Sequence, residues 1–348
     1  MSWLTDVEDD DEYSDYDESS ARVRPNPKGN RPRTKTRPGH EDAIPGRVLT
    51  VDRGRFTVLV GEDTAEERTV LAARARELGR TAIVANDTVE LVGDTTGTVG
   101  SLARVVRVAE RSTLLRRSAD DTDAVERVIV ANAEQMLIVI AAANPEPRPR
   151  LVDRYLVAAF DAGVRPIICV TKTDLADPEP FLANFAGLDL EVFRRGQDDD
   201  VTELAAALRG RVTVAVGHSG VGKSTLVNAL VPGAHRAIGR VNAVTGRGRH
   251  TSSSTVLLRL SGGGWVIDTP GVRSFGLGHV NTDNILRGFD DLARVAAECP
   301  RGCTHLPDAP DCELNEAVAR GELSADRVDS LQRLLTTLVP EHGATLNR

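Results

Sequence analysis

Residues 217–224, GHSGVGKS, have the spacing G-x-x-x-x-G-K-S of a phosphate-binding loop. They follow the strand-like run VTVAV and lead into KSTLVNAL, which is typical of a helix. Glycines let backbone N–H groups close around phosphate, and the dipole of the following helix favours negative charge. We therefore predict that Lys223 reaches the β- and γ-phosphates of a nucleotide and that Ser224 ligates Mg²⁺. The expected nucleotide contacts here are Gly217, His218, Ser219, Gly220, Val221, Gly222, Lys223, Ser224 and Thr225.

A second motif, TKTD, follows the apolar run RPIICV and is typical of a loop that recognises guanine. The Asp174 carboxylate can accept hydrogen bonds from N1 and N2 of guanine, while the Lys172 stem stacks on the ring. An ATPase is disfavoured by Asp174. The sequence thus predicts GTP and GDP as ligands of this base loop, Thr171, Lys172, Thr173 and Asp174.

Lysine is used selectively, with four lysines against 39 arginines. Lys28 and Lys35 lie near the N-terminus, whereas Lys172 and Lys223 fall one in each motif. A slim ammonium on a flexible stem does what the planar fork of Arg cannot imitate. This distribution argues against a chance match for either motif.

The sequence DTPG at residues 268–271 ends the strand-like run GWVID. Asp268 is placed to hold Mg²⁺ through water, and the Gly271 N–H can meet the γ-phosphate. Alone, the tetrapeptide reads as a plain Asp-Pro-Gly turn. Because it ends a strand about forty residues after a phosphate loop, we favour a nucleotide-sensing switch.

The order of these motifs is unusual, because the base loop precedes the phosphate loop. From about residue 125 the chain alternates strand-like and helical segments, and every element of a GTP-binding domain is present in rotated order. The termini of compact domains often lie close together, so a rotated order can build the same sheet. We predict a circularly permuted domain, in which STVLLRL and GWVID form a hairpin.

Five strand-like runs precede this domain and predict a small OB-type β-barrel. The stretch has one aromatic residue, Phe56, and many arginines, which favours contact with the backbone of folded RNA over stacking on bases. A solvated arginine-rich surface explains the same residues equally well. The runs are 46–51, 55–60, 80–85, 87–93 and 103–109.

Four potential metal ligands lie within fourteen residues of the mainly helical C-terminal segment. The spacing is C-x₃-C-x-H-x₆-C, and three thiolates with one imidazole suit a closed tetrahedral site for structural zinc. Unpaired reduced thiols are the alternative. Cys169 lies in an apolar run and is expected to be a buried small residue. The predicted zinc ligands are Cys299, Cys303, His305 and Cys312.

The net charge of -8 is dominated by the first twenty residues, which hold nine acids and no Lys or Arg. Basic residues among Pro and Gly follow, so we expect residues 1–43 to be a disordered tail. Contact of its basic part with nucleic acid is a less favoured alternative. We expect a cytoplasmic protein without a membrane anchor or disulfides, because no long apolar run or leader is found.

In combination, these motifs resemble the ribosome small-subunit-dependent GTPase A family over residues 44 to about 335. The resemblance also rests on ANAEQMLIVIAA, LVDRYLVAA, GRGRHTSSS, DTPGVRSFGL and CPRGCTHLPDAPDC. It implies a multidomain α/β protein: an OB-fold (44–112), a circularly permuted GTPase domain (113–278) and a zinc-binding helical domain (279–348). It further implies a monomer that binds the small ribosomal subunit and its rRNA. GTP hydrolysis stimulated by that subunit would serve its late assembly.

Three positions depart from common GTPase patterns. The family usually has Asn where this chain has Thr171, and RRGQ at 194–197 replaces a loop that normally carries a Ser-Ala pair. Val272 stands where many GTPases have a water-orienting Gln. The resemblance implies that His250 orients the water, although an exposed loop histidine explains the same residue. It also implies that Thr251, or else Ser252, ligates Mg²⁺. The alternative function is a nucleotide-gated rRNA-binding scaffold with negligible turnover.

Overall fold

The structure is a computed structural model that describes residues 39–52, 54–118, 126–233, 255–269, 275 and 277–338. Several sequence-based predictions lie outside these residues. They concern the tail up to residue 38 and the residues His250, Thr251, Ser252, Gly271 and Val272. Within the described residues, no helix has the length and apolar character needed to cross a bilayer.

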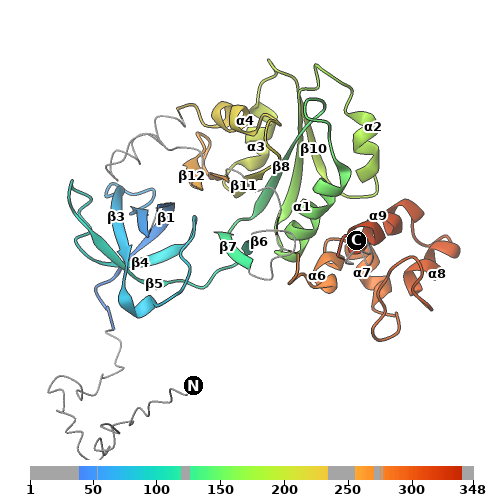
Figure 1. The fold of residues 1–348 in the computed structure, drawn as a ribbon, viewed down its shortest axis with the longest axis horizontal. Coiled ribbons are helices and arrows are strands. Elements are labelled where there is room, and N and C mark those ends of the chain that lie inside the picture. Colours follow the sequence, from blue (N-terminus) through green and yellow to red (C-terminus); the bar gives the residue numbers. More distant parts are fainter. Residues whose placement is uncertain are drawn as a thin grey trace, which may run out of the picture. The chain divides into compact units, whose positions relative to one another are not determined.

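The first five strands form a closed barrel, coloured blue to cyan in Figure 1. The strand order is β1-β2-β3-β5-β4, and β4 pairs back to β1, which confirms the predicted N-terminal barrel. Its interior is an apolar cluster that includes Val48, Phe56 and Leu91. The strands are β1 (Ile44–Asp52), β2 (Arg55–Val60), β3 (Arg68–Arg74), β4 (Thr88–Gly93) and β5 (Ala103–Val108), with a short 3-10 turn η2 (Arg76–Leu78).

The predicted strand at 80–85 is wrong, and the missing barrel strand is β3 instead. Ile83 and Val84 are buried, but the segment makes only one isolated bridge, Ala85 to Val130. The Val84 N–H donates to the Asp87 carboxylate at 2.7 Å, so its hydrogen bond is local rather than part of a sheet ladder. A short apolar run indicates that a segment is buried, but it does not by itself specify a strand.

A two-stranded hairpin that the sequence did not predict follows the barrel. It pairs β6 (Leu114–Ser118) with β7 (Glu126–Ala131) in antiparallel fashion. Because Leu115 and Val130 are buried, the hairpin adds to the core of the following domain.

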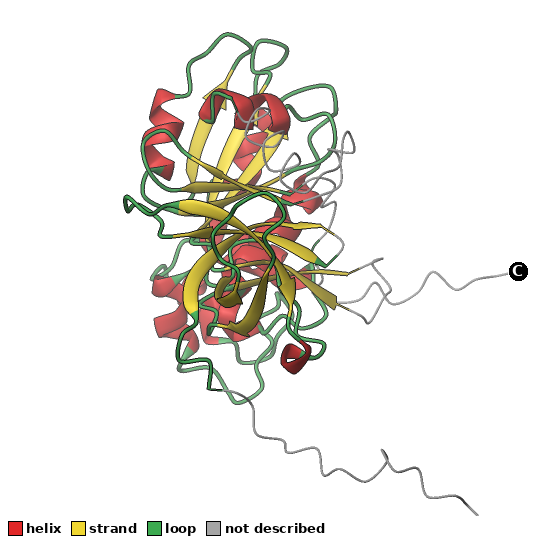
Figure 2. Ribbon diagram, turned by 90° about the vertical axis from the view of Figure 1, so that its left-hand side faces the viewer, coloured by secondary structure: helices red, strands yellow, loops and turns green. Residues whose placement is uncertain are grey.

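The α/β domain has the strand order β10-β9-β8-β11-β13-β12, parallel except for the antiparallel strand β12. β8 is buried at every position, as its continuous apolar sequence predicts for a strand covered on both faces. Ile138 and Ile140 pack in the cluster that contains α1, whereas Leu137 and Val139 pack with α3 and α4. Figure 2 shows helices beside this sheet. The elements are β8 (Gln135–Ala141), α1 (Pro149–Asp161), β9 (Arg165–Thr171), α2 (Glu179–Leu182), η3 (Ala183–Phe185), β10 (Glu191–Arg195), α3 (Thr202–Leu208), β11 (Val212–Val216), α4 (Lys223–Leu230), β12 (Val256–Arg259) and β13 (Trp265–Asp268).

The C-terminal segment is helical, as predicted. Buried side chains such as Phe289, Leu314 and Leu331 form its apolar centre. The Cys/His cluster lies in the loop between the second and third of its helices. The helices are α6 (Thr282–Leu286), α7 (Asp290–Ala296), α8 (Glu313–Ala319) and α9 (Ala325–Thr336).

Candidate nucleotide site and metal cluster

The predicted nucleotide-binding motifs meet because they end neighbouring parallel strands. β9 ends in the base loop, β11 in the phosphate loop, and β13 at Asp268. Since β9, β8, β11 and β13 are parallel, their carboxyl ends lie at the same edge of the sheet. Ligands of open α/β sheets bind at this edge.

The phosphate loop has a backbone shape that only its glycines permit. A Cβ atom on Gly217 would lie 2.5 Å from the Val139 carbonyl oxygen, and Gly222 has φ +89°. Helix α4 starts directly after Gly222, at Lys223, so its first N–H groups point out of the sheet edge. Ser224 and Thr225 are exposed there. This arrangement can bind an anion through backbone N–H groups.

Lys223 and Asp268 contact each other across the site. The Lys223 ammonium pairs with Asp268 Oδ1, and their side chains are 11% and 23% exposed. Next to this pair, the Thr269 hydroxyl donates to the Ala215 carbonyl of β11 at 2.7 Å and fixes the end of β13 against the phosphate-loop strand. Thr269 was not singled out from the sequence, since its contact depends on a neighbouring strand.

The base loop also contacts the phosphate loop. Lys172 adopts φ +56°, and its ammonium donates to the Gly220 carbonyl at 2.8 Å and to the Asn144 carbonyl. Thr171 is buried, and its hydroxyl donates to the Val221 carbonyl of the same loop. Asp174 is exposed at the site, where a ligand can reach its carboxylate.

The altered loop at 194–197 lies beside Asp174. The Gln197 N–H donates to Asp174 Oδ1 at 3.1 Å, and the Gly196 N–H donates to Asp199 Oδ2 at 2.6 Å. The Arg194 side chain is held by Glu179 at 2.6 Å and 3.1 Å. Backbone groups of this loop therefore adjoin the base loop although its side chains differ from the usual pair. The contact of Gln197 has no signal in the local sequence, because it depends on a loop more than twenty residues away.

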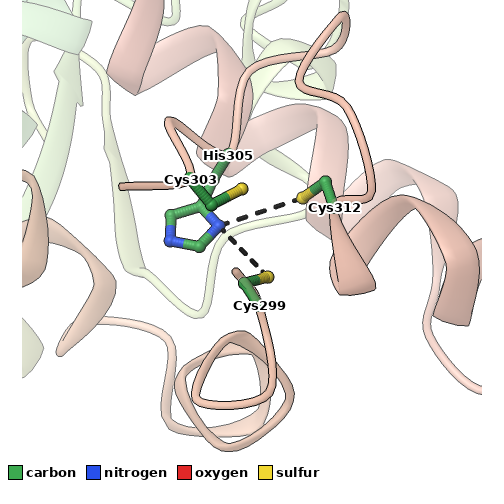
Figure 3. Close-up of side chains that lie close together, drawn as sticks. All are labelled: Cys299, Cys303, His305 and Cys312. Carbon is green, nitrogen blue, oxygen red and sulfur yellow. Dashed lines mark hydrogen bonds between the residues drawn. The ribbon is translucent and has the colours of Figure 1, made fainter. Parts of the chain in front are cut away.

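The four predicted metal ligands converge, as Figure 3 shows. Their ligand atoms all lie within 4.8 Å of one another. His305 Nδ1 lies 3.6 Å from Cys299 Sγ and 3.9 Å from Cys312 Sγ, and the Glu313 N–H donates to Cys299 Sγ at 3.3 Å. Three sulfur atoms and one imidazole nitrogen in this arrangement fit a tetrahedral metal site. The cluster can therefore hold a metal ion.

Burial affects the imidazole and one thiol of the cluster differently, because it favours the metal-binding form of His305 and opposes that of Cys312. Desolvation lowers the pKa of His305, which favours the neutral imidazole that a metal requires. Burial raises the pKa of the Cys312 thiol to about 11. A bound cation reverses this preference, because a coordinating thiol loses its proton.

The rotated order of elements around a phosphate loop and a guanine-type base loop defines the class: a circularly permuted P-loop GTPase. The fold agrees with solved structures. The crystal structure of YjeQ from Thermotoga maritima is similar with a TM-score of 0.61 and 23% identity, covering 85% of this chain and 98% of that one. The crystal structure of YloQ, a circularly permuted GTPase, also gives a TM-score of 0.61 and 23% identity, covering 87% and 98%.

Sequence comparisons narrow the class to a family. The family model described as RsgA GTPase matches residues 108–278. A relative from Azotobacter vinelandii, named small ribosomal subunit biogenesis GTPase RsgA, is 39% identical over 70% of this chain and 72% of its own length. A relative of the same name from Ectopseudomonas mendocina is 40% identical over 60% of this chain and 63% of its own length. The chain belongs to the RsgA GTPase family.

Proposed function

We propose that this GTPase hydrolyses GTP to GDP and phosphate as a factor in the late assembly of the small ribosomal subunit, and that the subunit stimulates it. The supporting observation is that phosphate loop and base loop meet at one sheet edge and contact each other through Lys172 and Gly220. Relatives such as the one from Pseudomonas aeruginosa strain PAO1 carry the name small ribosomal subunit biogenesis GTPase RsgA. We further propose rRNA as a partner and the cytoplasm as the location.

Different residues of the described site would bind different parts of the nucleotide. Asp174 would accept from guanine N1 and N2 while the Lys172 stem covers the ring. Lys223 would leave Asp268 to bind the β- and γ-phosphates, since a phosphate carries more negative charge than one carboxylate. The N–H groups from Gly220 to Thr225 would close around the phosphates.

Magnesium fits the oxygen donors at this edge. Ser224 and Asp268 present a hydroxyl and a carboxylate, the kinds of ligand that Mg²⁺ takes. When bound at these residues, Mg²⁺ would supply positive charge that neutralises the negative charge developing on the phosphate oxygens. We propose Thr251 as a further ligand and the Gly271 N–H as a γ-phosphate donor; both lie outside the described residues.

The water-orienting group is proposed to be His250, which also lies outside the described residues. Val272 cannot orient water, and an imidazole can accept a proton near neutral pH. His250→Ala should lower subunit-stimulated turnover by about a hundredfold and leave GTP affinity nearly unchanged, because the group acts only in the transition state. Unchanged stimulated turnover in this variant would exclude the role.

Zinc is the metal that we propose for the Cys/His cluster, with a structural role, because a closed Cys₃His set leaves no position for substrate. We also propose the boundaries 44–112 for the barrel domain, 113–278 for the GTPase domain and 279–348 for the zinc-binding domain. The protein is proposed to act as a monomer.

The decisive test is GTP turnover of the purified chain with and without isolated small ribosomal subunits. We expect stimulation by small subunits and none by large subunits at equal concentration. Binding to small subunits without any rise in turnover would contradict the proposal and favour a nucleotide-gated scaffold instead.

A further inference from the structure

Thr171 occupies the first position of the base loop but is directed into the protein. Its side chain is 4% exposed, and Oγ1 lies 2.5 Å from the Val221 carbonyl oxygen and 3.1 Å from the Ile140 carbonyl oxygen. A hydroxyl has one proton to donate, and O–H···O bonds are usually about 2.5–3.0 Å long. The proton therefore goes to Val221, in the phosphate loop, fifty residues further along the chain.

The peptide between Val221 and Gly222 links this bond to the phosphates. A trans peptide is planar, so its C=O and N–H point in opposite directions. When the Thr171 hydroxyl holds the Val221 oxygen on the protein side, the Gly222 N–H must point away from Thr171, toward the open side of the loop. Gly222 precedes α4, where unpaired N–H groups bind anions.

Gly222 lies near Thr171 and has a backbone conformation that favours glycine. Gly222 has φ +89°, and a Cβ atom there would already lie 3.5 Å from Thr171 Oγ1 and 3.8 Å from its Cβ and Cγ2. Thr171 thus lies beside the loop, and its hydrogen bond to Val221 joins the two. The adjacent Lys172 holds the preceding carbonyl, that of Gly220, at 2.8 Å.

We propose that Thr171 is a positioning residue that aims the Gly222 N–H at the β-phosphate, and that it makes no contact with guanine. The proposal rests on the proposed nucleotide site. It separates two tasks within one motif: Thr171 supports phosphate binding through the loop, whereas the exposed Asp174 reads the base. Replacement of the usual Asn by Thr then leaves the support of the phosphate loop intact.

Affinities for three nucleotides separate these tasks. GDP and GMP differ in the β-phosphate, so their affinity ratio measures the phosphate loop. GDP and IDP differ in the 2-amino group, so their ratio measures base reading. Thr171→Val removes the hydroxyl at constant shape, and Thr171→Ser keeps it. Thr213→Val is the matched control, since this buried hydroxyl bonds Gln135 at 2.9 Å at the opposite end of β11.

In the full-length protein, Thr171→Val should weaken GDP binding about tenfold, the usual cost of a buried hydrogen-bond partner left unpaired. GMP affinity should change by less than about twofold, and the GDP to IDP ratio should stay constant. Thr171→Ser and Thr213→Val should both keep the wild-type GDP to GMP ratio. If Thr171→Val does not fold, Thr171→Ala against Thr171→Ser makes the same comparison.

A changed GDP to IDP ratio with a constant GDP to GMP ratio would place Thr171 at the base and overturn the proposal. Equal loss for GDP and GMP, or the same loss in Thr213→Val, would reduce Thr171 to a general structural role and also overturn it. If the wild-type protein binds no GDP, the proposed function itself fails, which is a different result from either of these.

Discussion

The nucleotide site and the Cys/His cluster collect their residues from very different lengths of chain. The nucleotide site joins the ends of three strands, and its described residues extend from Thr171 to Asp268. The cluster takes its four ligands from residues 299–312, one loop and the first residue before α8. Both bring polar atoms together, but only the first depends on a sheet to do so.

The two sites are therefore maintained by different interactions. The nucleotide site is supported by buried strands and by hydrogen bonds between loops, such as those of Thr171 and Thr269. The cluster places three thiols within 4.8 Å, and three thiolates at that distance repel one another unless a cation neutralises them. We therefore expect the first site to persist without ligand and the second to depend on its metal.

Zinc removal should have the largest effect. We expect one zinc per chain, and a zinc-selective chelator should accelerate hydrogen exchange in residues 290–336, because structural zinc contributes about 10–16 kcal/mol in small zinc domains. Exchange in β8 and β11 should change little. Cys303→Ser should lose zinc, whereas the matched variant Cys169→Ala, at the cysteine outside the cluster, should retain it.

Equal acceleration of hydrogen exchange in β8 and in α8 after chelation would contradict the expected difference between the two sites, because the two regions would then unfold together. Metal analysis that finds no zinc in freshly purified, unchelated protein would contradict the expectation that the cluster depends on a bound metal.

Lys223→Ala should reduce GTP turnover by about a hundredfold or more, the usual loss when one charge-stabilising donor is removed. The ammonium is nearly enclosed beside Asp268, at the sheet edge where the phosphates would bind. Measurements of steady-state GTP turnover test this loss, and Arg209→Ala, a substitution of an exposed residue, is the control. Zinc content should be unaffected, and a loss of zinc in Lys223→Ala would show that the two sites are coupled.

Asp174→Asn should weaken GTP binding by about a hundredfold and favour xanthosine triphosphate. The amide would present a donor to the guanine N1–H, whereas the 2-oxo group of xanthine accepts from it. Competition binding with the two nucleotides measures this preference. Asp177→Asn, at an exposed carboxylate in the same loop, is the control and should leave the preference unchanged.

The smallest effect concerns an ion pair of the C-terminal helices. Arg327 donates to both oxygens of Asp291 and lowers the pKa of that carboxyl. The pair is partly exposed and screened by solvent, so Asp291→Asn should cost only about 0.5 kcal/mol of unfolding free energy at neutral pH. Denaturant titrations of the zinc-loaded protein measure it, with Asp290→Asn as the exposed control.

The sign of the pH dependence follows from the lowered pKa. A carboxyl with a lowered folded-state pKa stabilises the protein fully above the ordinary value of about 3.9. This contribution disappears as the pH falls through the folded-state value. The difference between wild type and Asp291→Asn should therefore shrink in acid, and a difference that grows in acid would contradict the assignment.

Features that are local in the chain could be predicted from the amino-acid sequence. The phosphate loop, the base loop and the Cys/His spacing each specify a backbone shape or donor set within a few residues, and the permuted order follows from their sequence. The continuous apolar run of β8 likewise predicted a strand covered on both faces, which the structure confirms.

The contacts between distant segments could not be predicted in this way, because they depend on the folded structure. It replaced the expected strand at 80–85 with β3, because barrel pairing is a choice among segments of similar apolar character. It also directed the Thr171 hydroxyl to Val221 and the Gln197 N–H to Asp174. A hydrogen bond needs its partner within about 3 Å, and across fifty residues that distance is set by the sheet and not by the motif.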